Sequence, residues 1–313
     1  MEKISFCIPC YRSEKTIKTV IKEIEYEMNK TTKYDYEIVC VVDGSPDDVF
    51  GVLCDLGKNN RRIKVVNLAR NFGQSGARMA SLYYATGEYM VCLDDDGQCP
   101  MDCFWNLFSQ IENGFDVSIA KYIKKKQSVI KNIGSYFNKV TTHILLDVDK
   151  DFKMTNFFVM KSFVVEKILE YKNPYPFMTG LITRVTTNIA FVQMNDRNRL
   201  QGETGYTLKK LISHWLNGFT AFSIKPLRIS SFIGAICAFA GFVFMVYTVI
   251  RKIVGDNITV GYSSIVAILL FVGGLLMLML GMIGEYIGRI YICLNNSPQY
   301  VVKDVVNIDE KDK

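Results

Sequence analysis

The 313-residue sequence lacks several signatures of nucleotide-binding and metal-binding proteins. It has no GxGxxG motif and no GxxxxGKS/T loop, which argues against a dinucleotide-dependent enzyme and a P-loop NTPase. Its nine cysteines do not show the two CxxC pairs of a structural zinc site. The opening apolar stretch is too short for a secretory leader. These absences favour free thiols in the reducing cytosol.

Charged residues are missing from two long stretches, 230–250 and 258–284. Each exceeds the roughly 18 apolar residues that mark a helix able to cross a bilayer core of about 30 Å. Two buried helices of a soluble protein are the alternative, which the length of both stretches disfavours. We therefore predict a transmembrane hairpin, with helices at 229–252 and 258–284 and both chain ends on the same side of the membrane.

The first 205 residues alternate between short apolar runs and segments with helical spacing of apolar residues. Strands are predicted to begin near residues 3, 36, 63, 88 and 116, and helices near 13, 48, 74 and 101. This alternation is typical of an α/β domain with a doubly wound, mostly parallel sheet. Ligands of such sheets bind at the carboxyl ends of the strands.

Three adjacent carboxylates follow one of these predicted strands, in the segment DDDGQ at 94–98. Asp94 and Asp96 project to the same side of an extended chain, whereas Asp95 points the other way. With the amide oxygen of Gln98 they offer an all-oxygen site that suits Mg²⁺ or Mn²⁺, which also bind substrate phosphates. An acidic surface turn is the alternative reading.

Asp43 has a similar position, after the apolar run IVCVV and before Gly44 and Ser45. A carboxylate at the end of a buried strand can accept a hydrogen bond from a ring N–H of uracil or guanine. The alternative is a residue that only forms the turn.

Six short motifs follow one another along the chain: IPCYRSE at 8–14, VVDGS at 41–45, ARNFGQ at 69–74, DDDGQ at 94–98, RLQGETGY at 199–206 and GEYIGRIY at 284–291. In this order they resemble the family 2 glycosyltransferases of the GT-A fold. The subgroup that they resemble is the polyprenyl-phosphate glycosyltransferases, which include dolichyl-phosphate mannose synthase and the GtrB- and ArnC-like enzymes. Four positions depart from the family pattern: Val42 replaces Asp, Gly97 replaces Leu, Thr204 replaces Ser and Gly205 replaces Lys. Glu14 matches the family motif only with a shift of one residue.

The resemblance implies an enzyme that transfers one sugar, with inversion, from a UDP- or GDP-linked sugar to polyprenyl phosphate. The reaction is expected at the cytosolic face of the plasma membrane, in the assembly or modification of cell-envelope glycans. The metal and diphosphate site maps to Asp94, Asp96 and Gln98, with Asp96 and Arg199 as the catalytic pair. Contacts to the nucleotide sugar are expected at Pro9, Tyr11, Glu14, Asp43, Asn71, Asp94 and Asp95.

A phosphate monoester acceptor has a second pKa of about 6, so much of it is already a dianionic nucleophile at cytosolic pH. No strong general base is then needed. Positioning and charge stabilisation would drive the reaction, with Arg199 binding the acceptor phosphate through a charge-assisted contact.

The predicted layout is a GT-A catalytic domain at 1–205, an amphipathic interfacial helix with its linker at 206–228, the two membrane helices, and a cytosolic tail at 285–313. Membrane lipids are expected partners, and nucleic acid is not. The Gly-rich second helix is compatible with a homo-oligomer or with packing inside the hairpin. The alternatives are another lipid or polysaccharide acceptor, although no QxxRW motif is present, and a non-catalytic membrane scaffold.

Overall fold

The computed structural model describes residues 1–122, 154–174, 176–195, 197, 262–295 and 297–308, together with single positions between 232 and 253. The chain divides into two compact units. The first contains Met1–Trp215 and Asn296–Lys313, and the second contains Leu216–Asn295. The predicted interfacial helix at 206–228 and most of the first membrane helix lie outside the described residues.

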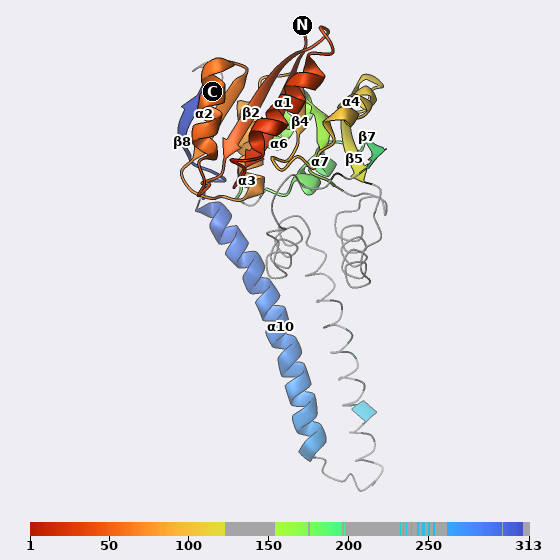
Figure 1. The fold of residues 1–313 in the computed structure, drawn as a ribbon. Coiled ribbons are helices and arrows are strands. Elements are labelled where there is room, and N and C mark those ends of the chain that lie inside the picture. Colours follow the sequence, from red (N-terminus) through yellow and green to blue (C-terminus); the bar gives the residue numbers. More distant parts are fainter. Residues whose placement is uncertain are drawn as a thin grey trace. The chain divides into compact units, whose positions relative to one another are not determined.

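The first unit is built on an eight-stranded sheet with the order β7-β5-β6-β4-β1-β2-β3-β8 (Figure 1). Its centre is parallel, because β1 pairs in parallel with β2 and β4, and β2 with β3. Strand β5 pairs in parallel with β7, whereas β6 and β8 run antiparallel to their neighbours. The strands are β1 Lys3–Cys10, β2 Asp35–Val42, β3 Ile63–Leu68, β4 Tyr89–Cys92, β5 Val117–Tyr122, β6 Phe158–Lys161, β7 Ile189–Met194 and β8 Val302–Val306.

Helices cover both faces of this sheet, as the mostly parallel α/β prediction requires (Figure 1). Alternate residues of β2 face opposite sides: Ile38 joins the core under α1, α2 and α4, whereas Val39 and Val41 pack against α3. The predicted fold class is therefore confirmed. The helices are α1 Ile17–Met28, α2 Val49–Asn59, α3 Gln74–Tyr84, the 3-10 helix η1 Met101–Cys103, α4 Phe104–Glu112, α6 Ser162–Leu169 and α7 Met178–Val185.

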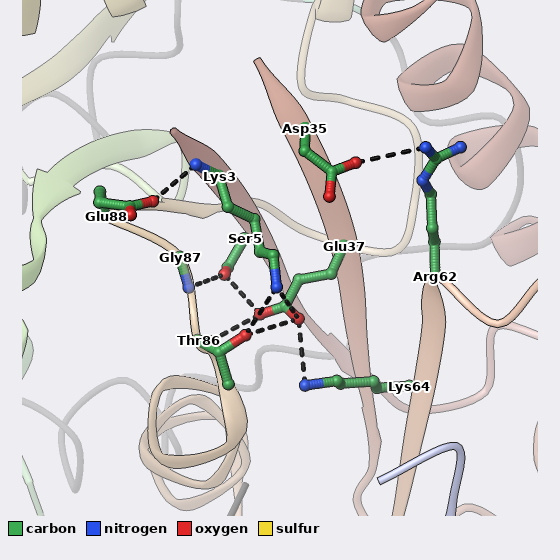
Figure 2. A network of polar contacts seen from close by, with 9 residues as sticks. All are labelled: Lys3, Ser5, Asp35, Glu37, Arg62, Lys64, Thr86, Gly87 and Glu88. Atoms are coloured by element: carbon green, nitrogen blue, oxygen red, sulfur yellow. Dashed lines mark hydrogen bonds and ion pairs between the residues drawn. The ribbon is translucent and has the colours of Figure 1, made fainter. Parts of the chain in front are cut away.

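A buried carboxylate joins the strands at their amino-terminal edge (Figure 2). Glu37 of β2 is 4% exposed and forms an ion pair with Lys64 of β3 at 3.0 Å. The Ser5 hydroxyl and the Thr86 backbone N–H each donate to Glu37 Oε1 at 2.6 Å. This network ties β1, β2, β3 and the turn before β4 together, at the edge of the sheet opposite the carboxyl ends.

The cysteines of the described chain are free thiols. Cys7 and Cys10 have a CxxC spacing, but both are buried within β1. A single CxxC inside a buried strand does not provide a zinc site.

The second unit contains helix α10, Tyr262–Leu294. Its segment Phe271–Leu294 has a mean hydropathy of 1.7, and it is the one helix in the described part of the chain that is long and apolar enough to cross a membrane. The described positions between 232 and 253 are helical. Gly234 lies against Met279, whose Cε would be 2.6 Å from a Cβ at that glycine, so the two apolar segments contact each other.

Candidate functional site

The polar residues that follow β1, β2 and β4 meet at the carboxyl edge of the sheet, as predicted. The Tyr11 N–H donates to Asp95 Oδ2 at 2.9 Å and so joins the ends of β1 and β4. The Asp43 N–H donates to the Cys10 carbonyl at 3.0 Å and joins β1 to β2. Three segments far apart in the sequence therefore form one polar edge, because parallel strands end on the same side of a sheet.

Asp94 is held by donors from two other elements. Gln74 Nε2 donates to Asp94 Oδ1, and Asn156 Nδ2 donates to Oδ2, both at 2.7 Å. The Arg78 guanidinium lies 3.7 Å from Asp94 Oδ1 and is 6% exposed. Since Gln74 and Arg78 are four residues apart on α3, they share one face of that helix. The helix and the segment before β6 thus fix the orientation of this carboxylate.

The turn that follows Asp94 is shaped by a glycine. Gly97 has a φ of 75°, a left-handed conformation that glycine adopts without strain. The Gln98 N–H donates to Asp96 Oδ1 at 3.0 Å, which closes the turn. Asp96 therefore lies beside the polar edge with its side chain folded over its own loop.

Gln98 also connects this turn to the segment that leads to Arg199. Its Nε2 donates to the Arg197 carbonyl at 3.3 Å. The Arg197 guanidinium contacts Glu23 of α1 at 3.1 Å and Asp102 of η1 at 2.7 Å. Arg199 itself, with the RLQGETGY motif, lies outside the described residues. The chain is nevertheless anchored at the DDDGQ loop two residues before it.

The donor set of this loop fits a hard divalent cation. Asp94 and Asp96 supply carboxylate oxygens, and an ionised carboxylate has about four acceptor positions. Gln98 donates from Nε2 to the Arg197 carbonyl, so its Oε1 is the atom that would contact a cation. No cluster of three His, Cys, Asp or Glu side chains with metal spacing occurs in the described chain. Mg²⁺ does not require one, because it binds one or two carboxylates and completes its shell with water and substrate phosphates.

The middle carboxylate of the loop has an unusual acidity. Burial, together with the neighbouring charges of Asp94 and Asp96, raises the pKa of Asp95 from 3.8 to about 6. The Tyr11 N–H bond opposes this shift by stabilising the charged form. Asp95 thus belongs to the core of the loop and joins it to the end of β1.

Asp43 holds the loop that follows β3. It is 3% exposed, and its two carboxylate oxygens accept the N–H groups of Phe72 at 2.6 Å and Gly73 at 2.9 Å. Burial raises the pKa of Asp43, and these two bonds lower it. The Asn71 amide donates to the Asp43 carbonyl at 3.1 Å. Both residues are thus part of one loop anchor, and their contact with a nucleotide base stays a prediction.

The remaining predicted contact residues frame the same edge. The Glu14 N–H donates to Asp47 Oδ2 at 2.9 Å, and Glu14 Oε2 accepts the Asp48 N–H at 3.3 Å, so the IPCYRSE segment is linked in both directions to the turn that follows VVDGS. The Tyr11 side chain is 43% exposed. Pro9 is buried in β1 beside Val41 of β2. Tyr11 and Glu14 are thus exposed at this edge, whereas Pro9 is not.

Known families match both parts of the chain. The glycosyl transferase family 2 model matches residues 5–169, and the GtrB C-terminal hairpin model matches residues 225–290. The chain belongs to glycosyltransferase family 2. It is therefore an enzyme that transfers sugars, built from a GT-A domain and a GtrB-type hairpin.

Several curated glycosyltransferases are similar along nearly their whole length. The "Uncharacterized glycosyltransferase YkcC" of Bacillus subtilis (strain 168) is 31% identical. The match covers 98% of this chain and 95% of that protein. The "Bactoprenol glucosyl transferase" of Shigella phage SfII is 30% identical, with 96% of this chain and 97% of that protein covered.

Solved structures share the fold at much lower identity. Glucosyl-3-phosphoglycerate synthase from Mycobacterium tuberculosis, in complex with Mn²⁺ and UDP-glucose, superposes with a TM-score of 0.52 at 18% identity. The match covers 70% of this chain and 79% of that one. This likeness supports the GT-A assignment of the catalytic domain.

Proposed function

We propose that this family 2 glycosyltransferase transfers a single sugar from a nucleotide-diphosphate sugar to polyprenyl phosphate, at the cytosolic face of the plasma membrane and with inversion. The observation that carries the proposal is the loop at 94–98, whose carboxylates lie at the carboxyl edge of the sheet and are tied to the chain just before Arg199. The chain that leads into the predicted acceptor motif is thereby held at the predicted donor site.

The hairpin supports a lipid acceptor. The same chain that carries the donor loop contains the GtrB-type hairpin and an apolar helix long enough to cross a bilayer. Relatives that align with nearly the whole of this chain are named bactoprenol glucosyl transferases or a homolog of them, and bactoprenol is a polyprenyl lipid. Glucose is therefore the first sugar to test, and a multi-pass location in the plasma membrane follows from the same reading.

The proposed reaction needs little covalent chemistry from the protein. A phosphate oxygen of the acceptor attacks the anomeric carbon, and the bond from that carbon to the donor's diphosphate oxygen breaks. The nucleoside diphosphate leaves with both electrons of that bond. A divalent cation, when bound, supplies positive charge to this leaving group, and Asp94, Asp96 and Gln98 are the residues that would hold the ion. Arg199 would hold the acceptor phosphate in line.

A lipid-transfer assay tests this proposal. Purified full-length enzyme in detergent is mixed with undecaprenyl phosphate, Mg²⁺ or Mn²⁺, and radiolabelled UDP-glucose or other UDP- and GDP-sugars. We expect label in the organic extract only when metal and acceptor are both present. Asp96→Asn should abolish the product, whereas the matched control Asp55→Asn, at an exposed acid on α2, should not. Folded enzyme that labels no lipid with any donor would contradict the proposal.

A further inference from the structure

The chain that leaves the apolar helix α10 returns to the catalytic domain. Strand β8 pairs antiparallel with β3, with Val302 opposite Leu68 and Val306 opposite Val65. Leu68 is the carboxyl end of β3, so β8 enters the sheet at the edge where the site lies. The segment before it, residues 297–301, therefore runs along the site edge, and we call these five residues the strap.

The strap borders the loop that follows β3. The Ala69 N–H donates to the Val301 carbonyl at 2.9 Å. Tyr300 and Phe72 pack on the same apolar cluster under α3. Phe72 is also one of the two residues whose N–H groups bind Asp43. The strap thus covers the outer side of the loop that Asp43 holds from within.

Gln299 makes the remaining contacts of the strap. Its carbonyl oxygen is 2.8 Å from the place where a Cβ on Gly76 would stand, so strap and α3 touch backbone to backbone. Its side-chain Nε2 donates to the carbonyls of Tyr171 at 2.7 Å and Asn173 at 2.8 Å, in the segment between α6 and α7. One residue therefore joins the first turn of α3 to a segment more than ninety residues further along the chain.

The contacted turn of α3 is the one that orients the donor loop. Gly76 is two residues after Gln74, and Gln74 donates to Asp94. We propose that Gln299 is a positioning residue for sugar transfer: through α3 it keeps Gln74, and hence Asp94, in the orientation that donor binding requires. This inference rests on the proposed function, because it takes the Asp94 loop as the donor site.

The far end of the same segment provides a matched control. Asn307 Nδ2 donates to two backbone carbonyls, those of Gly57 and Ile63, at 2.8 and 2.9 Å. Its chemistry thus equals that of Gln299, one amide bound to two carbonyls. Its contacts, however, are at the end of α2 and the start of β3, away from the carboxyl edge.

The experiment compares Gln299→Glu, Gln299→Lys and Asn307→Ala in the full-length enzyme. Glutamate keeps the shape of Gln299 but has no hydrogen to donate, whereas the lysine ammonium keeps donors for both carbonyls. In Gln299→Glu we expect about tenfold faster amide exchange in peptides 69–77 and 171–174, and a roughly tenfold loss of UDP affinity and of kcat/KM for the donor. Gln299→Lys should recover most of this loss. Asn307→Ala should change only exchange near 57–63 and thermal stability.

Two outcomes would overturn the inference. One is a Gln299→Glu enzyme whose amide hydrogens in peptides 69–77 and 171–174 exchange faster, while its UDP affinity and its kcat/KM equal those of the wild type. The other is an equal loss of affinity in Gln299→Glu and Asn307→Ala, which would make the strap a general stabilising element. If the wild type makes no lipid-linked sugar, the proposed acceptor is wrong. UDP affinity and amide exchange then still decide the role of Gln299.

Discussion

The side-chain amide of Gln74 donates a 2.7 Å hydrogen bond to Oδ1 of Asp94, the first carboxylate of the DDDGQ loop. Replacing this amide by a carboxylate, in Gln74→Glu, removes the donor and places two negative charges together. A hydrogen bond to a charged group is worth about 1.5–3 kcal/mol, so kcat/KM for the donor should fall by roughly tenfold or more.

The control for this prediction is Asn106→Asp, the same change from amide to acid on an exposed position of α4. It should leave the kinetics of sugar transfer unaltered. Steady-state measurements with the labelled donor provide both values. If Gln74→Glu retained the wild-type kcat/KM, the orientation of Asp94 by α3 would not matter for donor use.

Asp95 gives the protein a pH-dependent stability. Its folded pKa of about 6 is above the ordinary 3.8, so the native state binds more protons than the unfolded state between these values. Stability should therefore fall as the pH rises from about 4 to about 6, and above 6 the native state contains a costly buried charge. Asp95→Asn removes the charge and keeps an oxygen for the Tyr11 N–H.

Thermal unfolding in EDTA checks this prediction. Asp95→Asn should unfold at a higher temperature than the wild type at pH 7.5, and the two midpoints should converge near pH 4. Asp55→Asn, whose side chain is three-quarters exposed, should show no such pH-dependent difference. A constant offset between Asp95→Asn and the wild type over the whole range would mean that Asp95 has an ordinary pKa.

The sequence was sufficient to predict the convergence of the site. The alternation of strands and helices implies parallel strands, and parallel strands end at one edge. Asp43, Asp94 and Asp96 could be placed together for this reason alone. The sequence did not predict that Asp43 accepts the N–H groups of Phe72 and Gly73. A carboxylate at the end of a strand can bind either a ligand or a neighbouring loop, and the sequence does not show where the backbone of residues 70–73 lies.

The sequence did not predict strand β8 or the contacts that Arg78 and Asn156 make with Asp94. Strand β8 is short, has exposed charges at Lys303 and Asp304, and pairs with a strand more than two hundred residues earlier. No local pattern identifies such a partner, so the sequence assigned this segment to the tail at 285–313. Arg78 and Asn156 reach Asp94 from different elements and belong to none of the six motifs. Only the helical spacing of Gln74 and Arg78 after β3 was a usable hint.

Glu37 should be essential for stability and dispensable for chemistry. Its side chain is buried and pairs with Lys64, whose side chain is 10% exposed, at the amino-terminal edge of the sheet. Removing one partner of a buried ion pair typically costs about 3–5 kcal/mol. Glu37→Ala should therefore lower the unfolding midpoint by many degrees, while the fraction that stays folded at low temperature transfers sugar with the wild-type kcat/KM.

The exposed pair Asp55–Lys58 is the reference for Glu37, because both side chains are about three-quarters exposed. Lys58→Ala should change the free energy of unfolding by less than about 1 kcal/mol. Thermal melts of both variants, with transfer assays at low temperature, measure the two effects separately. A Glu37→Ala enzyme as stable as Lys58→Ala would show that the network in Figure 2 adds little to stability.

Arg197 should govern use of the acceptor. Its guanidinium bridges Glu23 of α1 and Asp102 of η1, and its carbonyl accepts a bond from Gln98, two residues before Arg199. Arg197→Ala removes the contacts that hold the chain just before the RLQGETGY motif. Because a charge-assisted contact to the acceptor is then misplaced, the KM for polyprenyl phosphate should rise about tenfold. The KM for the donor should change little. Arg197→Lys can reach one of the two carboxylates and should show a smaller rise.

Arg62→Ala, which removes the exposed contact to Asp35 at the other edge of the sheet, should leave both KM values unchanged. An Arg197→Ala enzyme with altered donor KM and normal acceptor KM would separate this anchor from the acceptor site.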